Sequence, residues 1–166
     1  VSPEMAELVA ESGLRWMATD EAVLWPSLSV DSRKRGALYR PWRVVTPRGE
    51  VAVFFRDREL SDRIGFVYQH WETREAVEDF VARVRRIGEE HGGDTPPVVS
   101  VILDGENCWE HYLDDGGPFL DGLYRALEAA PDIATVTPTE VLDRGRPLDG
   151  LEHLHTGSWI DGDHRR

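Results

Sequence analysis

The sequence predicts an α/β fold in which helices pack outside a mainly parallel sheet. Short apolar runs that suit strands alternate along the chain with segments of helical periodicity, and this alternation is typical of parallel sheets. The chain has 166 residues, whereas a closed (β/α) barrel commonly needs about 250. We therefore expect a portion of one barrel domain rather than a complete barrel.

Capping signals place the helices. Ser2 is a good N-cap and Pro3 suits the first helical position, so a helix begins almost at the first residue and ends at Gly13. A long amphipathic helix is expected from Thr73 to the Gly-Gly pair at 92–93, because its apolar residues follow a 3.6-residue period.

Two further helices and four strands complete the expected order. One helix covers the apolar positions of 119–127, and another follows Thr137, which starts a capping box with Glu140. A polar loop is expected at 27–36. Strands are expected at 14–19, 51–55, 98–103 and 133–136, where short apolar runs occur.

Charge and composition exclude several classes of protein. The chain has 19 Lys and Arg against 31 Asp and Glu, a net charge of −12 that would repel a nucleic-acid backbone. No apolar stretch approaches the roughly 18 residues of a membrane span. Cys108 is the only cysteine, so an internal disulfide and a Cys-based zinc site are both excluded.

Both ends of the sequence lack the features of a domain boundary. A helix starts at once without a preceding Met, and the apolar segment 157–160 is followed only by a short polar tail. We expect residues 1–166 to be an internal fragment of a single barrel domain.

Acidic residues follow three of the expected strands. Parallel strands with right-handed crossovers have their carboxyl ends on one rim, where active sites of such folds lie. The acids expected there are Asp20, Glu21, Asp57, Glu59, Asp104 and Glu106. The alternative is that these acids only bond local backbone in turns, as Asp often does.

Clustered carboxylates suggest glycoside cleavage, in which one carboxyl group donates a proton and the other attacks or activates water. Asp104 is the better acid, because it follows six apolar residues and desolvation would raise its pKa. Aromatic rings such as Trp109, Tyr112 and Trp159 could stack on sugars, although packing in the core is the alternative for any one of them. The charged segment at 56–63 suits either hydroxyl recognition or a salt-linked loop. The side chains expected to bind substrate are Asp20, Glu21, Arg56, Asp57, Asp62, Glu106, Asn107, Trp109 and Trp159.

Several segments resemble a known family. The run 101–112 reads Val-Ile-Leu-Asp-Gly-Glu-Asn-Cys-Trp-Glu-His-Tyr, and it is followed by Gly116, Phe119-Leu120 and Leu123-Tyr124. It resembles the segment of glycoside hydrolase family 57 that carries the catalytic acid/base aspartate. Segments 1–21, 54–66 and 155–160 are similar to other parts of that family, in the same order.

The resemblance implies a retaining enzyme of the α-amylase, amylopullulanase or 4-α-glucanotransferase type, built on an incomplete (β/α)7 barrel. Its partner would be an α-glucan polysaccharide or oligosaccharide such as starch, glycogen or a pullulan-like chain, and its chemistry would need no metal or other cofactor. Asp104 would be the acid/base. The family's nucleophilic glutamate would precede Val1, so the isolated chain is expected to be inactive.

Two alternatives remain at this point. His153 and His155 with Asp104 or Asp57 would suit a divalent metal, as in polysaccharide deacetylases that use a related barrel. A non-catalytic carbohydrate-binding homologue would keep the aromatic side chains without turnover. A cytoplasmic location is the default expectation, because one cysteine does not indicate a disulfide-dependent protein.

Overall fold

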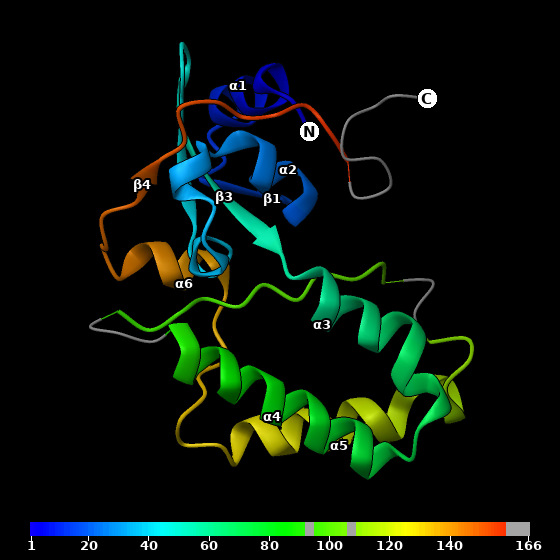
Figure 1. Ribbon diagram of the computed structural model, residues 1–166. Helices are drawn as coiled ribbons and strands as arrows, with labels where there is room; N and C mark the ends of the chain where they lie inside the picture. Colours follow the sequence, from blue (N-terminus) through cyan, green and yellow to red (C-terminus); the bar gives the residue numbers. More distant parts are fainter. Residues whose placement is uncertain (92–94, 106–108, 159–166) are drawn as a thin grey trace. The chain divides into compact units, whose positions relative to one another are not determined.

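The computed structural model describes residues 1–91, 95–105 and 109–158, which divide into two units (Figure 1). The first unit contains Val1–Asp57, Val98–Ser100 and the chain from Thr137 onward. The second contains Arg58–Pro97 and Val101–Val136. Among the described residues, no helix has the length and apolar character that crossing a bilayer requires.

A four-stranded sheet lies in the first unit. Its strands are β1 (Trp16–Asp20), β2 (Trp42–Thr46), β3 (Gly49–Arg56) and β4 (Asp149–Gly150), in the order β1-β3-β2-β4. β1 pairs with β3 and β2 with β4 in parallel, whereas β2 and β3 form an antiparallel hairpin. The apolar run 51–55 is buried in β3, as its lack of polar residues predicts.

Helices pack on this sheet. α1 (Pro3–Glu11) starts at Ser2, whose hydroxyl accepts a hydrogen bond from the Met5 amide, and it lies against β3. α2 (Glu21–Ser27) follows β1 directly and contacts both β1 and β3. α6 (Pro138–Asp143) carries the predicted capping box between Thr137 and Glu140. The expected polar loop contains two short 3₁₀ turns, η1 (Val30–Ser32) and η2 (Arg35–Ala37).

The second unit is helical. It contains α3 (Arg58–Asp62), a π-turn η3 (Arg63–Val67) and a 3₁₀ turn η4 (Tyr68–His70). It continues with α4 (Thr73–His91), η5 (Leu113–Gly116) and α5 (Gly117–Glu128). α4 and α5 lie side by side (Figure 1), and a Cβ at Gly122 would meet Val77 at an ordinary van der Waals distance of 3.5 Å.

The sequence prediction was wrong for two strands. Residues 98–103 are extended but form only one bridge, between Ser100 and Arg56. The Ile102 amide donates to the Ser61 hydroxyl at 3.1 Å rather than to a neighbouring strand. Residues 133–136 also lack strand structure, because no described strand pairs with them. β2, which was not predicted, shows the strand period in the alternating burial of Trp42, Arg43 and Val44.

A left-handed turn leads into α5. Asp114, Asp115 and Gly116 have φ values of 49°, 52° and 81°. Gly116 also has the Trp109 ring against it, since a Cβ added there would lie 2.6 Å from Trp109 Cε3. Glycine is therefore required at position 116 by both backbone conformation and space.

Gly116→Ala should destabilise the protein more than Gly145→Ala does. Gly145 has a similar φ of 66° but open space around its Cβ position, so the control reports only the left-handed strain of about 1–2 kcal/mol. The clash with Trp109 should add about 1–3 kcal/mol. The free energy of unfolding from urea titration measures both, and equal losses would contradict the packing of Trp109 on Gly116.

Candidate active site

Two charged residues lie at the carboxyl ends of the paired parallel strands β1 and β3. Asp20 is the last residue of β1 and Arg56 the last of β3, and the two are partners in the parallel register. Arg56 NH1 donates to Asp20 Oδ2 at 3.2 Å. Asp20 has no exposed surface and Arg56 is also buried, so the carboxyl ends of these strands meet around a desolvated ion pair.

Asp20 has a second structural task. Its other oxygen, Oδ1, accepts a hydrogen bond from the Ala22 amide at 2.9 Å, which makes Asp20 the N-cap of α2. One carboxylate thus joins β1, β3 and the start of α2. Both its oxygens are occupied and buried, so the observed contacts of Asp20 stabilise the fold. Its expected contact with substrate stays a prediction.

Asp57 is buried beside this pair. Its carboxylate accepts a hydrogen bond from the Tyr39 hydroxyl at 3.1 Å, and its amide donates to the Ser100 carbonyl at 2.9 Å. Burial, and secondarily the Asp57 carboxylate, raise the pKa of Tyr39 to about 12, although a hydrogen bond with Arg35 opposes the shift. Ser100 therefore forms a single parallel bridge with Arg56 at the end of β3.

Asp104 differs from Asp20 and Asp57 in its exposure. It follows 101–103, which are half-buried, and its own side chain is exposed in a turn of the second unit. The structure thus divides the strand-end acids into two kinds. Asp20 and Asp57 are buried, whereas the side chain of Asp104 is exposed.

The other expected site residues have different surroundings. Glu21 and Asp62 are half-buried at the starts of α2 and η3. Trp109 is half-buried in an aromatic cluster, with its ring centroid 5.5 Å from Tyr112 and 6.5 Å from Phe119. Its observed contacts are therefore packing contacts, and sugar stacking stays a prediction. The remaining three expected residues lie outside the described part of the chain: Glu106, Asn107 and Trp159.

Sequence reasoning missed Tyr39 and Ser61. Tyr39 lies beyond the polar loop, and nothing in the local pattern indicates that its hydroxyl reaches Asp57, eighteen positions away. Ser61 is fully buried and holds the backbone of Ile102. Both act through contacts between distant segments, and no local motif predicts such contacts.

The histidines of the metal alternative do not form a set of metal ligands with other residues that the structure describes. The rings of His153 and His155 lie 6.3 Å apart, with their planes at 77°. Within residues 1–91, 95–105 and 109–158, no three His, Cys, Asp or Glu side chains come close enough together to hold a metal ion.

Comparison with solved structures identifies the fold. The crystal structure of 4-alpha-glucanotransferase from Thermococcus litoralis matches with a TM-score of 0.71 and 19% identity, over 96% of this chain and 23% of that one. The novel alpha-amylase AmyC from Thermotoga maritima matches with a TM-score of 0.65 and 21% identity, over 91% of this chain and 40% of that one. The predicted fold class, an α/β part of a (β/α)7-type barrel with a mainly parallel sheet, is confirmed.

The family model for glycosyl hydrolase family 57 matches residues 1–151, so the chain belongs to that family. The resemblance noted from the sequence is thereby confirmed. No curated protein matches the sequence at a significant level. The chain spans less than half the length of either solved structure.

Asp20→Asn should destabilise the chain by about 3–5 kcal/mol. The amide keeps a cap for α2 but removes the buried negative charge that Arg56 NH1 contacts at 3.2 Å. Asp143→Asn is the matched control in the same unit, because Asp143 pairs with Arg15 at 2.8 Å with both side chains more than half exposed, and such pairs are worth under about 1 kcal/mol. Urea titration measures the free energy of unfolding of both variants. Equal losses of stability would refute the importance of the buried pair.

Stability should fall between pH 10 and 12 because of Tyr39. The unfolded phenol loses its proton near its ordinary pKa of 10.0, whereas the folded phenol keeps it up to about 12. The unfolded state therefore gains stability from ionisation first as pH rises. Tyr39→Phe should make the decline in the free energy of unfolding shallower over this window, and an unchanged slope would contradict the burial of this phenol.

Proposed function

We propose that the chain forms part of a retaining glycoside hydrolase or transglycosylase that acts on α-glucans, with Asp104 as the general acid/base. The observation that carries this proposal is the family match over residues 1–151, which includes the segment around Asp104. The names of the two similar structures, a 4-alpha-glucanotransferase and an alpha-amylase, support an α-glucan as the substrate.

The accessibility of the acids supports this role for Asp104. A general acid must reach the glycosidic oxygen of a bound sugar within hydrogen-bond distance. Asp20 and Asp57 are buried and already accept hydrogen bonds from Ala22, Arg56 and Tyr39. Asp104 has an exposed side chain and lies two residues after Ile102, whose amide donates to the Ser61 hydroxyl.

The proposed reaction has two steps. Asp104 gives a proton to the departing glycosidic oxygen while a carboxylate attacks the anomeric carbon and forms a glycosyl-enzyme ester. Asp104 then takes a proton from the water or sugar hydroxyl that displaces the ester, which retains the anomeric configuration. We propose that the attacking carboxylate is a glutamate that precedes Val1 in the complete enzyme, and that residues 1–166 alone do not turn over substrate.

Asp104→Asn should lower α-glucan cleavage at least about a hundredfold in a protein that joins this chain to its preceding sequence, because the amide cannot donate the acid proton. Asp115→Asn is the matched control: Asp115 is exposed in the same region, and Asn suits its left-handed backbone. Comparable rates for D104N and the unchanged protein would refute the role.

Product stereochemistry tests the same mechanism independently. NMR of the first product should show the α-anomer before mutarotation, and EDTA should leave the rate unchanged. An initial β-anomer would exclude the two-step route. Activity lost in EDTA and restored by zinc would favour metal-dependent chemistry, and glucan binding without cleavage would indicate a non-catalytic homologue.

A further inference from the structure

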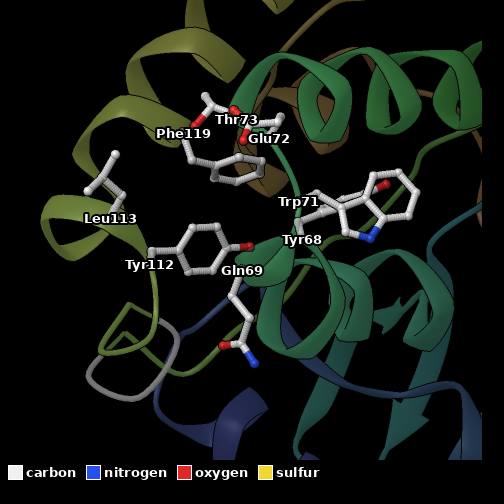
Figure 2. A pocket seen from close by; sticks show the side chains of 8 residues that line it. All are labelled: Tyr68, Gln69, Trp71, Glu72, Thr73, Tyr112, Leu113 and Phe119. Atoms are coloured by element: carbon white, nitrogen blue, oxygen red, sulfur yellow. The ribbon is translucent and has the colours of Figure 1, made fainter.

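The second unit contains a pocket that the acid/base proposal does not use. It has a volume of about 190 Å³ and lies between the turn that precedes α4 and the segment that leads into α5 (Figure 2). Asp104 is not among its lining residues. The described residues that line it are Tyr68, Gln69, Trp71, Glu72, Thr73, Tyr112, Leu113 and Phe119.

Aromatic rings form the walls, and hydrogen bonds fix them. The ring centroid of Phe119 lies 5.2 Å from that of Tyr112 and 6.0 Å from that of Tyr68. The Tyr68 hydroxyl donates to Asp79 Oδ2 at 2.7 Å, and the Tyr112 hydroxyl donates to the Ile64 carbonyl at 2.5 Å. Figure 2 shows the Tyr112 and Phe119 rings next to each other at this pocket. The walls are therefore set before a ligand arrives.

Charged side chains hold Asp79, the hydrogen-bond partner of the Tyr68 hydroxyl. Asp79 also accepts a hydrogen bond from Arg83 Nε at 2.7 Å, and Arg83 NH1 reaches Glu59 at 2.8 Å. Burial alone would raise the pKa of Asp79, but the hydrogen bonds from Arg83 and Tyr68 hold it below its usual value. The Asp79 carboxylate that accepts the hydrogen bond from Tyr68 thus stays ionised at neutral pH. The Tyr68 ring therefore keeps its orientation.

The mouth combines exposed apolar and polar groups. Trp71 is 42% and Leu113 71% exposed, and the other lining residues apart from Glu72 are buried or half-buried. Glu72 is exposed, and Gln69 Oε1 is buried without a hydrogen-bond partner among the residues that the structure describes. No described lining residue is basic, and the Glu72 carboxylate would repel an anion.

We propose that this pocket binds one glucosyl unit of an α-glucan chain. The inference rests on the proposed function for the class of ligand, and on the pocket for the place. A neutral sugar ring presents C–H groups that suit the faces of Trp71 and Tyr112, and hydroxyl groups that can donate to Glu72. The volume of the pocket fits a single hexose ring, so a longer chain would continue into solvent past Leu113.

Isothermal titration of the chain with maltotriose tests the proposal. Trp71→Ala should weaken binding about tenfold, since the sugar loses the aromatic face on which it would stack. Glu72→Gln, at an exposed position that leaves the fold unchanged, should also weaken it. Tyr124→Ala is the control, because Tyr124 is a 64% exposed aromatic residue of the same unit outside the pocket. Circular dichroism confirms that each variant is folded.

Three results would overturn the proposal. They are no measurable binding of maltotriose, equal affinity in the Trp71→Ala and Tyr124→Ala variants, and binding of tetramethylammonium in preference to maltotriose, which would mark a cation site between aromatic rings.

The binding test of the pocket and the cleavage test of Asp104 can fail independently. Asp104→Asn should leave maltotriose affinity at this pocket unchanged while cleavage is lost. Loss of cleavage without any pocket binding would reject only the pocket, and pocket binding with normal cleavage in D104N would reject only the acid/base role.

Discussion

The ion pair between Asp20 and Arg56 is the interaction on which the arrangement of the first unit depends. It lies where β1 and β3 end in register, and its carboxylate has no exposed surface. Because Asp20 also caps α2, the same carboxylate sets the direction in which the chain leaves the sheet. Arg56 bridges to Ser100, and from there the chain continues toward Asp104. A buried charge needs its partner and its hydrogen bonds. Loss of the ion pair would therefore loosen β1, β3 and the start of α2 together.

This constraint changes how the acids at the strand ends are understood. An acidic residue after a strand suggests catalysis, yet the two most buried examples, Asp20 and Asp57, have contacts that hold backbone, a guanidinium and a phenol. The accessible acid, Asp104, lies beyond the last backbone contact of the 98–102 segment. Burial therefore separates the two acids that hold the fold of the first unit from the exposed acid of the second unit.

The features predicted correctly from the sequence have local causes. Ser2 and Thr137 start helices because their side chains bond amides within three residues, and β3 is recognisable from an unbroken apolar run. The segment 98–103 is just as apolar, but a strand needs a neighbour, and here a side chain, Ser61, takes that place. Within the candidate site, Asp104 stays a prediction from the family resemblance, whereas Tyr39 reaches Asp57 through a contact that no spacing rule contains. Sequence therefore predicts caps and periodicity well, and long-range polar contacts poorly.

The order of segments along the chain has a consequence for biosynthesis. The first unit takes residues from both sides of the second, so α6 and β4 are made only after Val136. Domains commonly fold during synthesis, from the amino-terminal side, but this sheet gains its last strand only after the helical unit has been made. The edge of β2 that β4 covers stays open until then, and an open strand edge can pair with another chain.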